Sequence, residues 1–279
     1  MAKRGAAFYW LSLFFALFVL FLYGPIVTIG ILSFQGPNGG LTFPMNGVSL
    51  HWFYDLFEQQ AVGDIWGAFT RSLVLGLIVM SATVVLSVMG GLAFRNAFRG
   101  SSVVFYLVIA SLIIPSILIS LGVGLIFNIL GLPVHWATSG LGSQLTWTLP
   151  FGLLIMFAVF NRFDKSYEEA GRDLGATPWQ TVRHVVLPII APSLIGVALF
   201  GFTLSYDEFA RTLLTAGSYN TLPLEIFGMT TNVTTPVLYA LGTLTTLFSL
   251  LIIGSFLTAA IIIRRRREKQ GSDAGKGMV

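Results

Sequence analysis

The chain has 279 residues, a formal net charge of +4 and no cysteine. Hydrophobic residues make up 55% of it and charged residues only 10%, whereas a soluble domain carries about 25% charged residues. This composition excludes an ordinary soluble domain and indicates a protein embedded in a membrane. The lack of cysteine excludes disulfides, thiolate chemistry and cysteine-ligated metals.

Apolar stretches long enough to cross a bilayer occur six times, since a spanning helix needs about 20 apolar residues. They cover residues 8–34, 68–94, 103–127, 143–161, 188–213 and 236–263. The first stretch exceeds the apolar core of a signal peptide, which is about 7–15 residues long. We therefore expect it to be retained, and the expected fold class is an all-α integral membrane protein with six transmembrane helices.

The basic residues predict how these spans are oriented. Of the 16 lysines and arginines, all but Arg71 and Arg211 fall in four segments. Those segments are residues 1–7, 95–102, 162–187 and the tail 264–279. The positive-inside rule then places both termini in the cytoplasm. The run RRRREK in the tail is typical of an anchor beside anionic lipid, so the basic pI does not require a nucleic-acid partner.

An outer segment, LHWFYDLFE at residues 50–58, alternates aromatic and polar residues. This pattern favours a short helix that lies flat in the membrane interface. Contact with another protein is the alternative for the same surface.

A polar stretch, SYEEAGRDLGATPWQTVRHVVLP at residues 166–188, separates the fourth and fifth spans. Ser166 with Glu169, and Thr177 with Gln180, have the spacing of capping boxes at helix N-termini. The stretch is therefore expected to form two short helices on the cytoplasmic side.

Two further residues mark the bend of this hairpin. Pro178 suits the first position of a helix, and Gly175 falls where the preceding helix must end. Helices this short are marginal in isolation, so we expect the hairpin to dock on another protein, with a simple solvated linker as the alternative. Its candidate apolar residues are Ala170, Leu174, Ala176, Trp179, Val182 and Val185.

The same stretch resembles the EAA loop found in permease subunits of ABC importers. Glu169-Ala170-Gly171, Gly175 and Val185-x-Leu187-Pro188 follow the family pattern E-A-A-x3-G-x9-I-x-L-P at every spacing, with Gly171 and Val185 as departures. In that family the loop forms coupling helices that lie in a groove of the ATPase subunit. The resemblance implies that the ATPase-coupling residues are Glu169, Ala170, Gly171, Leu174, Gly175, Leu187 and Pro188.

Residues 201–229, GFTLSYDEFARTLLTAGSYNTLPLEIFGM, are similar to the region after this loop in spermidine/putrescine-type importers. The resemblance covers about residues 65–265. It implies a type I ABC-importer permease fold in a single transmembrane domain, residues 1–279, with a core at 65–265 and a cytoplasmic loop at 162–187.

Two adjacent carboxylates, Asp207 and Glu208, follow the fifth span. Carboxylates within a membrane are costly and usually face a bundle interior or an aqueous path. Pairing with Arg211 at an interfacial helix end is the alternative. The family resemblance favours the path, for which we expect Tyr206, Asp207, Glu208 and Glu225, with Tyr206 offering an aromatic face to a cation.

An enzyme is not expected. The ATP-binding motif G-x-x-x-x-G-K-[ST] does not occur in the sequence, and His51, His135 and His184 fall in separate segments. We therefore expect no catalytic residue, no metal site and no cofactor on this chain, with ATP and Mg bound by a partner ATPase.

The resemblance implies a bacterial inner-membrane location and several protein partners. These are a second permease, expected to form a heterodimer with this chain, two ABC ATPase subunits and a substrate-binding protein. The implied function is ATP-driven import of a small organic solute, with a polyamine expected. The alternatives are an importer of a different solute and a passive structural or receptor-like six-span protein.

Overall fold

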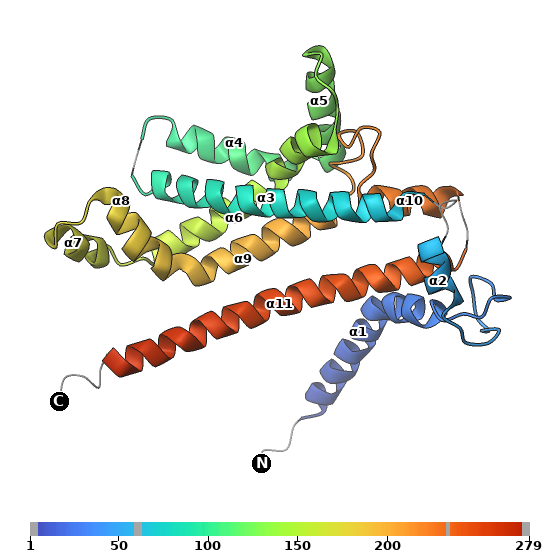
Figure 1. The fold of residues 1–279 in the computed structure, drawn as a ribbon. Helices are drawn as coiled ribbons and strands as arrows, with labels where there is room; N and C mark the ends of the chain where they lie inside the picture. Colours follow the sequence, from blue (N-terminus) through green and yellow to red (C-terminus); the bar gives the residue numbers. More distant parts are fainter. Residues whose placement is uncertain (1–4, 59–62, 97, 233–234, 275–279) are drawn as a thin grey trace. The chain divides into compact units, whose positions relative to one another are not determined.

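The computed structural model describes residues 5–58, 63–96, 98–232 and 235–274 (Figure 1). The regular elements in those residues are helices, together with one isolated antiparallel bridge between Gln35 and Val48. The chain divides into two compact units, Met1–Gly63 with Ile226–Leu250, and Asp64–Glu225 with Leu251–Val279. The single permease domain of residues 1–279 stays a prediction.

The first unit contains α1 (Ala6–Leu32) and α2 (His51–Glu58). The short helix expected at residues 50–58 is thus confirmed as a helix. Between α1 and α2 the loop folds around the buried amide of Gln35, whose Oε1 accepts a hydrogen bond from the Asn46 N–H at 2.8 Å. The Tyr239 hydroxyl, on α11 (Val237–Ala274), donates to the Leu41 carbonyl at 2.7 Å and so ties this loop to the helix.

The second unit is built on α3 (Ile65–Phe94), α6 (Leu141–Asn161) and α9 (Leu187–Tyr206), which pack side by side (Figure 1). Small residues let these helices approach closely, as membrane helices commonly do. A Cβ on Gly201 would lie 3.2 Å from the Met80 Cα. The buried core beneath them contains Met156, Phe160, Val186, Ile190 and Val197.

The third predicted span, residues 103–127, is not one straight helix. It consists of α4 (Ser101–Ile113) and α5 (Ser116–Ile129), which meet at an angle of 112°. The physical reason is Pro115, which has no N–H to donate to the carbonyl of Ser111 one turn earlier. The break lies where the sequence shows Pro115, although uniform hydropathy across it predicted continuity.

The fifth predicted span, residues 188–213, has different limits at both ends. The helical run begins at α8 (Pro178–Thr181), continues through the π-helix η3 (Val182–Val186) and ends with α9 at Tyr206. The stretch 209–214, although mostly apolar, therefore belongs to a turn region and not to the helix. Hydroxyls of other elements hold that region: Ser143 donates to the Arg211 carbonyl at 2.9 Å and Ser139 to the Thr215 carbonyl at 2.8 Å.

The remaining predicted spans are close to those observed. The fourth starts earlier than expected, because a π-helix, η2 (Trp136–Gly140), leads directly into α6. After α10 (Leu222–Asn232), the last apolar helix runs through Val237–Ile263. In the part of the chain that is described, five helices are long and apolar enough to cross a membrane, and the bent α4–α5 pair makes six. The cytoplasmic placement of both termini stays a prediction.

Candidate functional site

The polar hairpin is made of α7 (Ser166–Asp173) and α8, joined by a tight turn at one end of the second unit (Figure 1). Gly175 has φ = +81°, a left-handed conformation that favours glycine. Its N–H donates to the Arg172 carbonyl at 2.8 Å, and the Ala176 N–H donates to the Gly171 carbonyl at 3.0 Å. These bonds satisfy the last carbonyls of α7, as in a glycine-terminated helix. Gly175 therefore sets the bend, as predicted.

The capping box at the start of α8 is confirmed. The Gln180 N–H donates to Thr177 Oγ1 at 3.3 Å, and the Thr177 N–H donates to Gln180 Oε1 at 2.8 Å. Pro178 occupies the first helical position, where its missing N–H costs nothing. The second arm of the hairpin is thus fixed by its own side chains.

The capping box predicted for Ser166 and Glu169 is wrong. Lys165 is the N-cap residue of α7, and Ser166 is already inside the helix. At the helix start, the carboxylate of Asp164, two residues before Ser166, accepts a hydrogen bond from the Ser166 N–H at 2.9 Å. Hydrogen bonds from Ser166 hold the pKa of Asp164 below its usual value. The helix starts one residue sooner than expected.

The hairpin presents apolar side chains to solvent around its bend. Leu174 is 89% exposed and Trp179 is 66% exposed, and Ala170 is also exposed. The other candidate apolar residues, Ala176, Val182 and Val185, are half-buried against the chain itself. The expected apolar side therefore divides into an inner part that anchors the hairpin and an outer part, Ala170, Leu174 and Trp179, that is uncovered in this chain.

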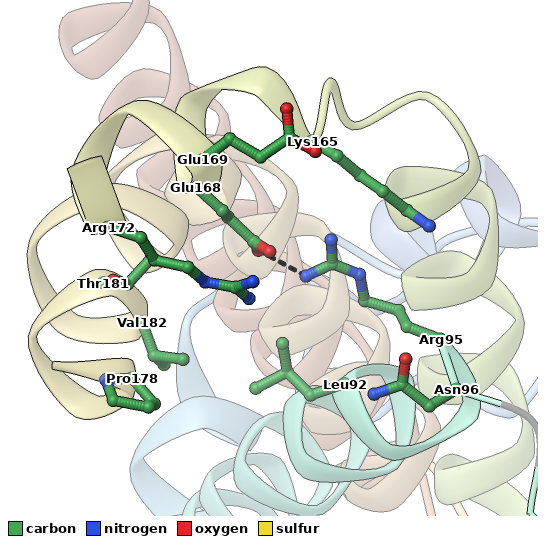
Figure 2. Close-up of a pocket in the computed structure, with 10 residues that line it drawn as sticks. All are labelled: Leu92, Arg95, Asn96, Lys165, Glu168, Glu169, Arg172, Pro178, Thr181 and Val182. Atoms are coloured by element: carbon green, nitrogen blue, oxygen red, sulfur yellow. Dashed lines mark hydrogen bonds and ion pairs between the residues drawn. The ribbon is translucent and has the colours of Figure 1, made fainter. Parts of the chain in front are cut away.

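Glu168 and Glu169 are neighbours in sequence with different surroundings (Figure 2). Glu168 Oε1 forms an ion pair of 2.5 Å with Arg95 Nη1, and the two side chains are only 13% and 15% exposed. The Glu169 carboxylate is exposed and, within the described residues, makes no hydrogen bond or ion pair. Sequence reasoning selected Glu169 and missed both Glu168 and Arg95.

A pocket of about 330 Å³ lies between the hairpin and the C-terminal end of α3 (Figure 2). Its lining is strongly charged and includes the Arg95–Glu168 pair. The full lining consists of Leu92, Arg95, Asn96, Lys165, Glu168, Glu169, Arg172, Pro178, Thr181 and Val182. The remaining predicted coupling residues, Leu187 and Pro188, lie at the start of α9, where Leu187 packs on the core and Pro188 is exposed.

The predicted path residues lie in two places. Tyr206, Asp207 and Glu208 are contiguous at the end of α9, whereas Glu225 lies in α10. The Tyr206 ring is buried and stacks on Phe202 at 5.7 Å between centroids. The ring therefore does not offer the open aromatic face to a cation that the sequence predicted.

The two carboxylates after Tyr206 differ in their contacts. Asp207 is exposed. Glu208 is half-buried and accepts a hydrogen bond from the Arg211 backbone N–H at 2.9 Å. Glu225 accepts from the Asp64 N–H at 3.1 Å and from Asn220 Nδ2 at 2.8 Å, so both of its oxygens are engaged by neighbouring loops.

The Arg211 side chain is fully buried and turns toward α4 and α6. Its Nη1 donates to Thr146 Oγ1, its Nη2 donates to the Ser111 carbonyl at 3.3 Å, and its guanidinium lies 5.0 Å from the Trp147 ring centroid. Among the described residues, no ion pair joins this guanidinium to Asp207 or Glu208. The alternative of surface pairing is therefore wrong for the guanidinium.

Metal binding has no visible basis in the described part of the chain, where no group of three or more His, Asp or Glu side chains is arranged to hold an ion. That the chain binds no cofactor stays a prediction.

An all-helical membrane protein with a structured polar hairpin between two spans has the architecture of a transporter's membrane subunit. The family model for binding-protein-dependent transport system inner membrane components matches residues 83–268. The chain belongs to this family and is a multi-pass inner-membrane permease subunit of the ABC importer type.

Curated relatives are similar over most of the chain. The spermidine/putrescine transport system permease protein PotC of Haemophilus influenzae is 28% identical over 235 residues, covering 84% of this chain and 89% of the relative. The putrescine transport system permease protein PotI of Escherichia coli (strain K12) is 28% identical over 232 residues, covering 80% and 81%.

Solved structures share the fold. A bacterial alginate ABC transporter in complex with a periplasmic protein bound to an alginate pentasaccharide has a TM-score of 0.69 at 14% identity, covering 93% of this chain and 94% of that one. The MetNI methionine ABC transporter in inward-facing conformations has a TM-score of 0.55 at 18% identity, covering 71% and 94%. The type I importer permease fold implied by the sequence is thus confirmed.

Proposed function

We propose that this chain carries a polyamine across the inner membrane as one permease of an ATP-driven importer. A second permease completes the path, two separate ATPase subunits bind the cytoplasmic hairpin, and a binding protein delivers the solute from outside. ATP and Mg²⁺ bind to the ATPase subunits in this proposal. The observation that carries it is the hairpin itself, which is rigidly built yet leaves its bend uncovered.

The uncovered part of the hairpin has the chemistry of a docking surface. Ala170, Leu174 and Trp179 offer exposed apolar area beside the unpaired Glu169 carboxylate. Removing apolar area from water is favourable in proportion to its size, and a charged group at the rim of an interface gives orientation and specificity. A groove with an apolar floor and a cation at its rim would fit this surface.

The rigidity of the bend supports a mechanical role. The turn at Gly175 is closed by two backbone hydrogen bonds, and α8 is closed by a reciprocal capping box. From α8 the helical run continues through η3 into α9 without interruption. A displacement of the hairpin would therefore be passed along the backbone to a membrane span.

The solute class is supported by the relatives and by the acidic turn. PotC and PotI are named for transport of spermidine and putrescine, which are cations. Asp207 presents an exposed carboxylate and Glu208 a half-buried one at the end of α9, and carboxylates can replace part of the hydration that a cation loses in a path. In this proposal Tyr206 positions the two carboxylates by its buried packing, and Glu225 adds negative charge in α10.

The proposal is tested by co-expressing the chain with its partner subunits and measuring both assembly and uptake of radiolabelled spermidine. Glu169→Lys and Gly175→Leu are expected to weaken retention of the ATPase subunits in mild detergent and to abolish uptake. Normal uptake in both variants, at wild-type amounts in the membrane, would contradict the assignment of the hairpin. If the wild-type assembly does not take up spermidine, the proposed solute class is contradicted, but the assignment of the hairpin is not.

A further inference from the structure

The hairpin has two arms, and they are attached to the membrane spans in different ways. The α8 arm continues through η3 into α9, and the fully buried Val186 of η3 belongs to the core. The α7 arm follows α6 across residues 162–165 but has no backbone continuation into α3, because residues 95–165 separate the end of α3 from the start of α7. Any force on α7 must reach α3 through side chains.

Arg95 is placed to make that connection. It is the C-cap residue of α3, so its position moves with the end of that helix. Its guanidinium forms the ion pair with Glu168 of α7 (Figure 2). The same guanidinium lies 5.2 Å from the ring centroids of both Phe160 and Phe163. One side chain thus contacts α7, the end of α6 and the segment that follows α6.

The pair is shielded from water, which distinguishes it from an ordinary surface salt bridge. Exposed ion pairs contribute little because water and salt screen them. Here Glu168 is 13% exposed and Arg95 is 15% exposed, and removing one partner would leave a poorly hydrated charge without compensation. The Phe160 and Phe163 rings beside the guanidinium stabilise the cation further.

Other charges near the pair do not replace it. Lys165, Glu169 and Arg172 line the same pocket, but all three are exposed. Glu169 follows Glu168 by one residue, a rotation of about 100° around the helix, and its carboxylate is exposed where that of Glu168 is shielded. The inward and outward glutamates therefore have separable roles.

We propose that the Arg95–Glu168 pair is the positioning contact that makes α7 and the cytoplasmic end of α3 move as one body. This inference rests on the proposed function, because it assigns a path for force that the ATPase subunits apply at the hairpin. Since α3 packs on both α6 and α9, rigid attachment of α7 delivers that force to the centre of the second unit. Glu168 acts through Arg95 and does not touch the ATPase.

The chain contains no cysteine, so two labels can be introduced without background from this chain. Spin labels at Ala93→Cys and Asp173→Cys, both exposed and both inside helices, report the distance between α3 and α7 in the assembled complex. We expect one narrow distance distribution that is the same with and without ATP. In Glu168→Gln the distribution should broaden, and Arg95→Lys, which keeps the charge, should broaden it less.

Spermidine uptake and retention of the ATPase subunits supply the second readout, with Glu169→Gln as the matched control. Glu168→Gln should keep the ATPase subunits bound and reduce spermidine uptake roughly tenfold, within the range of coupling energies between contacting residues. Glu169→Gln should instead weaken ATPase retention while leaving the label distance narrow. If Glu168→Gln does not fold, the double variant Arg95→Gln with Glu168→Gln removes the uncompensated charge and should assemble with the same loss of uptake.

Different results would overturn different parts of the account. An unchanged distance distribution and unchanged uptake in Glu168→Gln would refute the positioning role. Loss of ATPase retention in Glu168→Gln equal to that in Glu169→Gln would make Glu168 part of the docking surface and would also refute it. Full retention and uptake in Glu169→Gln, Glu169→Lys and Gly175→Leu would refute the proposed function of the hairpin instead.

Discussion

The guanidinium of Arg211 donates a hydrogen bond to the carbonyl of Ser111, with 3.3 Å between Nη2 and the oxygen. Pro115 cannot donate to that carbonyl, because proline has no N–H. A residue in the turn after α9 therefore supplies the donor that the break between α4 and α5 removes. The bent span and the acidic turn are joined through one buried arginine.

Replacing Arg211 by Met should destabilise the protein. The change leaves the Ser111 carbonyl and Thr146 Oγ1 without this donor, and a buried unsatisfied group costs about 1–3 kcal/mol. Thermal unfolding in detergent, followed by tryptophan fluorescence, measures the loss. Pro115→Ala restores an N–H at the break, so the double variant should lose less than the sum of the two changes. Strict additivity would show that the arginine does not serve the break.

Replacing Gly171 by Ala should be tolerated. A Cβ at Gly171 would lie 3.7 Å from Val185 Cγ2 and 3.8 Å from Thr181 Oγ1, which is ordinary contact. Alanine also restores the family pattern and favours the helix by about 0.5–1 kcal/mol. Uptake and ATPase retention should stay at the wild-type level, and Gly171→Leu should reduce both. A severe loss in Gly171→Ala would mean that the first arm must bend at this residue.

Neutralising the acidic turn should separate transport from assembly. Asp207→Asn combined with Glu208→Gln is expected to reduce uptake of radiolabelled spermidine severely, because the cation loses the carboxylates that replace its hydration. The ATPase subunits should stay bound, since the hairpin is unchanged. Arg211→Lys serves as the comparison. If uptake falls more in Arg211→Lys than in the double neutralisation, the turn has a structural role and the cation path is wrong.

The stability contributed by Asp64 should depend on pH. Arg71 Nη1 lies 2.9 Å from Asp64 Oδ2, and the hydrogen bond from Arg71, followed by one from the Gly67 N–H, lowers the carboxyl pKa. A lowered folded-state pKa gives stability that is present above the unfolded value, near 3.9, and is lost as pH falls through the folded value. Wild type should therefore melt above Asp64→Asn at pH 7, and the difference should shrink as the pH falls below about 4. A constant difference would exclude this linkage.

Hydropathy predicted the spans well where the backbone hydrogen bonds lie within a single helix. It failed at the end of α9, because Ser139 and Ser143 hold the turn at Arg211 and Thr215 from other elements. Side-chain hydroxyls that are distant in sequence leave no periodic signal. The break between α4 and α5 does have a local signal in Pro115, but the hydrogen bond from Arg211 to the Ser111 carbonyl joins residues that are far apart along the chain.

The hairpin was predictable to the extent that its signals are local. Gly175, Pro178 and the Thr177–Gln180 box act over three or four residues and were found. Arg95 and Glu168 are 73 residues apart, so their pairing could not be read from local spacing. The start of α7 at Ser166 lies one residue earlier than the sequence predicted, and Asp164 accepts a hydrogen bond there from the Ser166 N–H.

The most direct test of the central claim is the amount of spermidine imported per ATP hydrolysed, in proteoliposomes that contain the whole assembly. Gly175→Leu places a branched side chain in the left-handed conformation of the bend, whereas Gly175→Asn substitutes a residue that visits this conformation more readily. The account predicts that the ratio collapses in Gly175→Leu and is largely kept in Gly175→Asn. An equal, wild-type ratio in both variants would contradict the claim that the hairpin couples the ATPase to the spans.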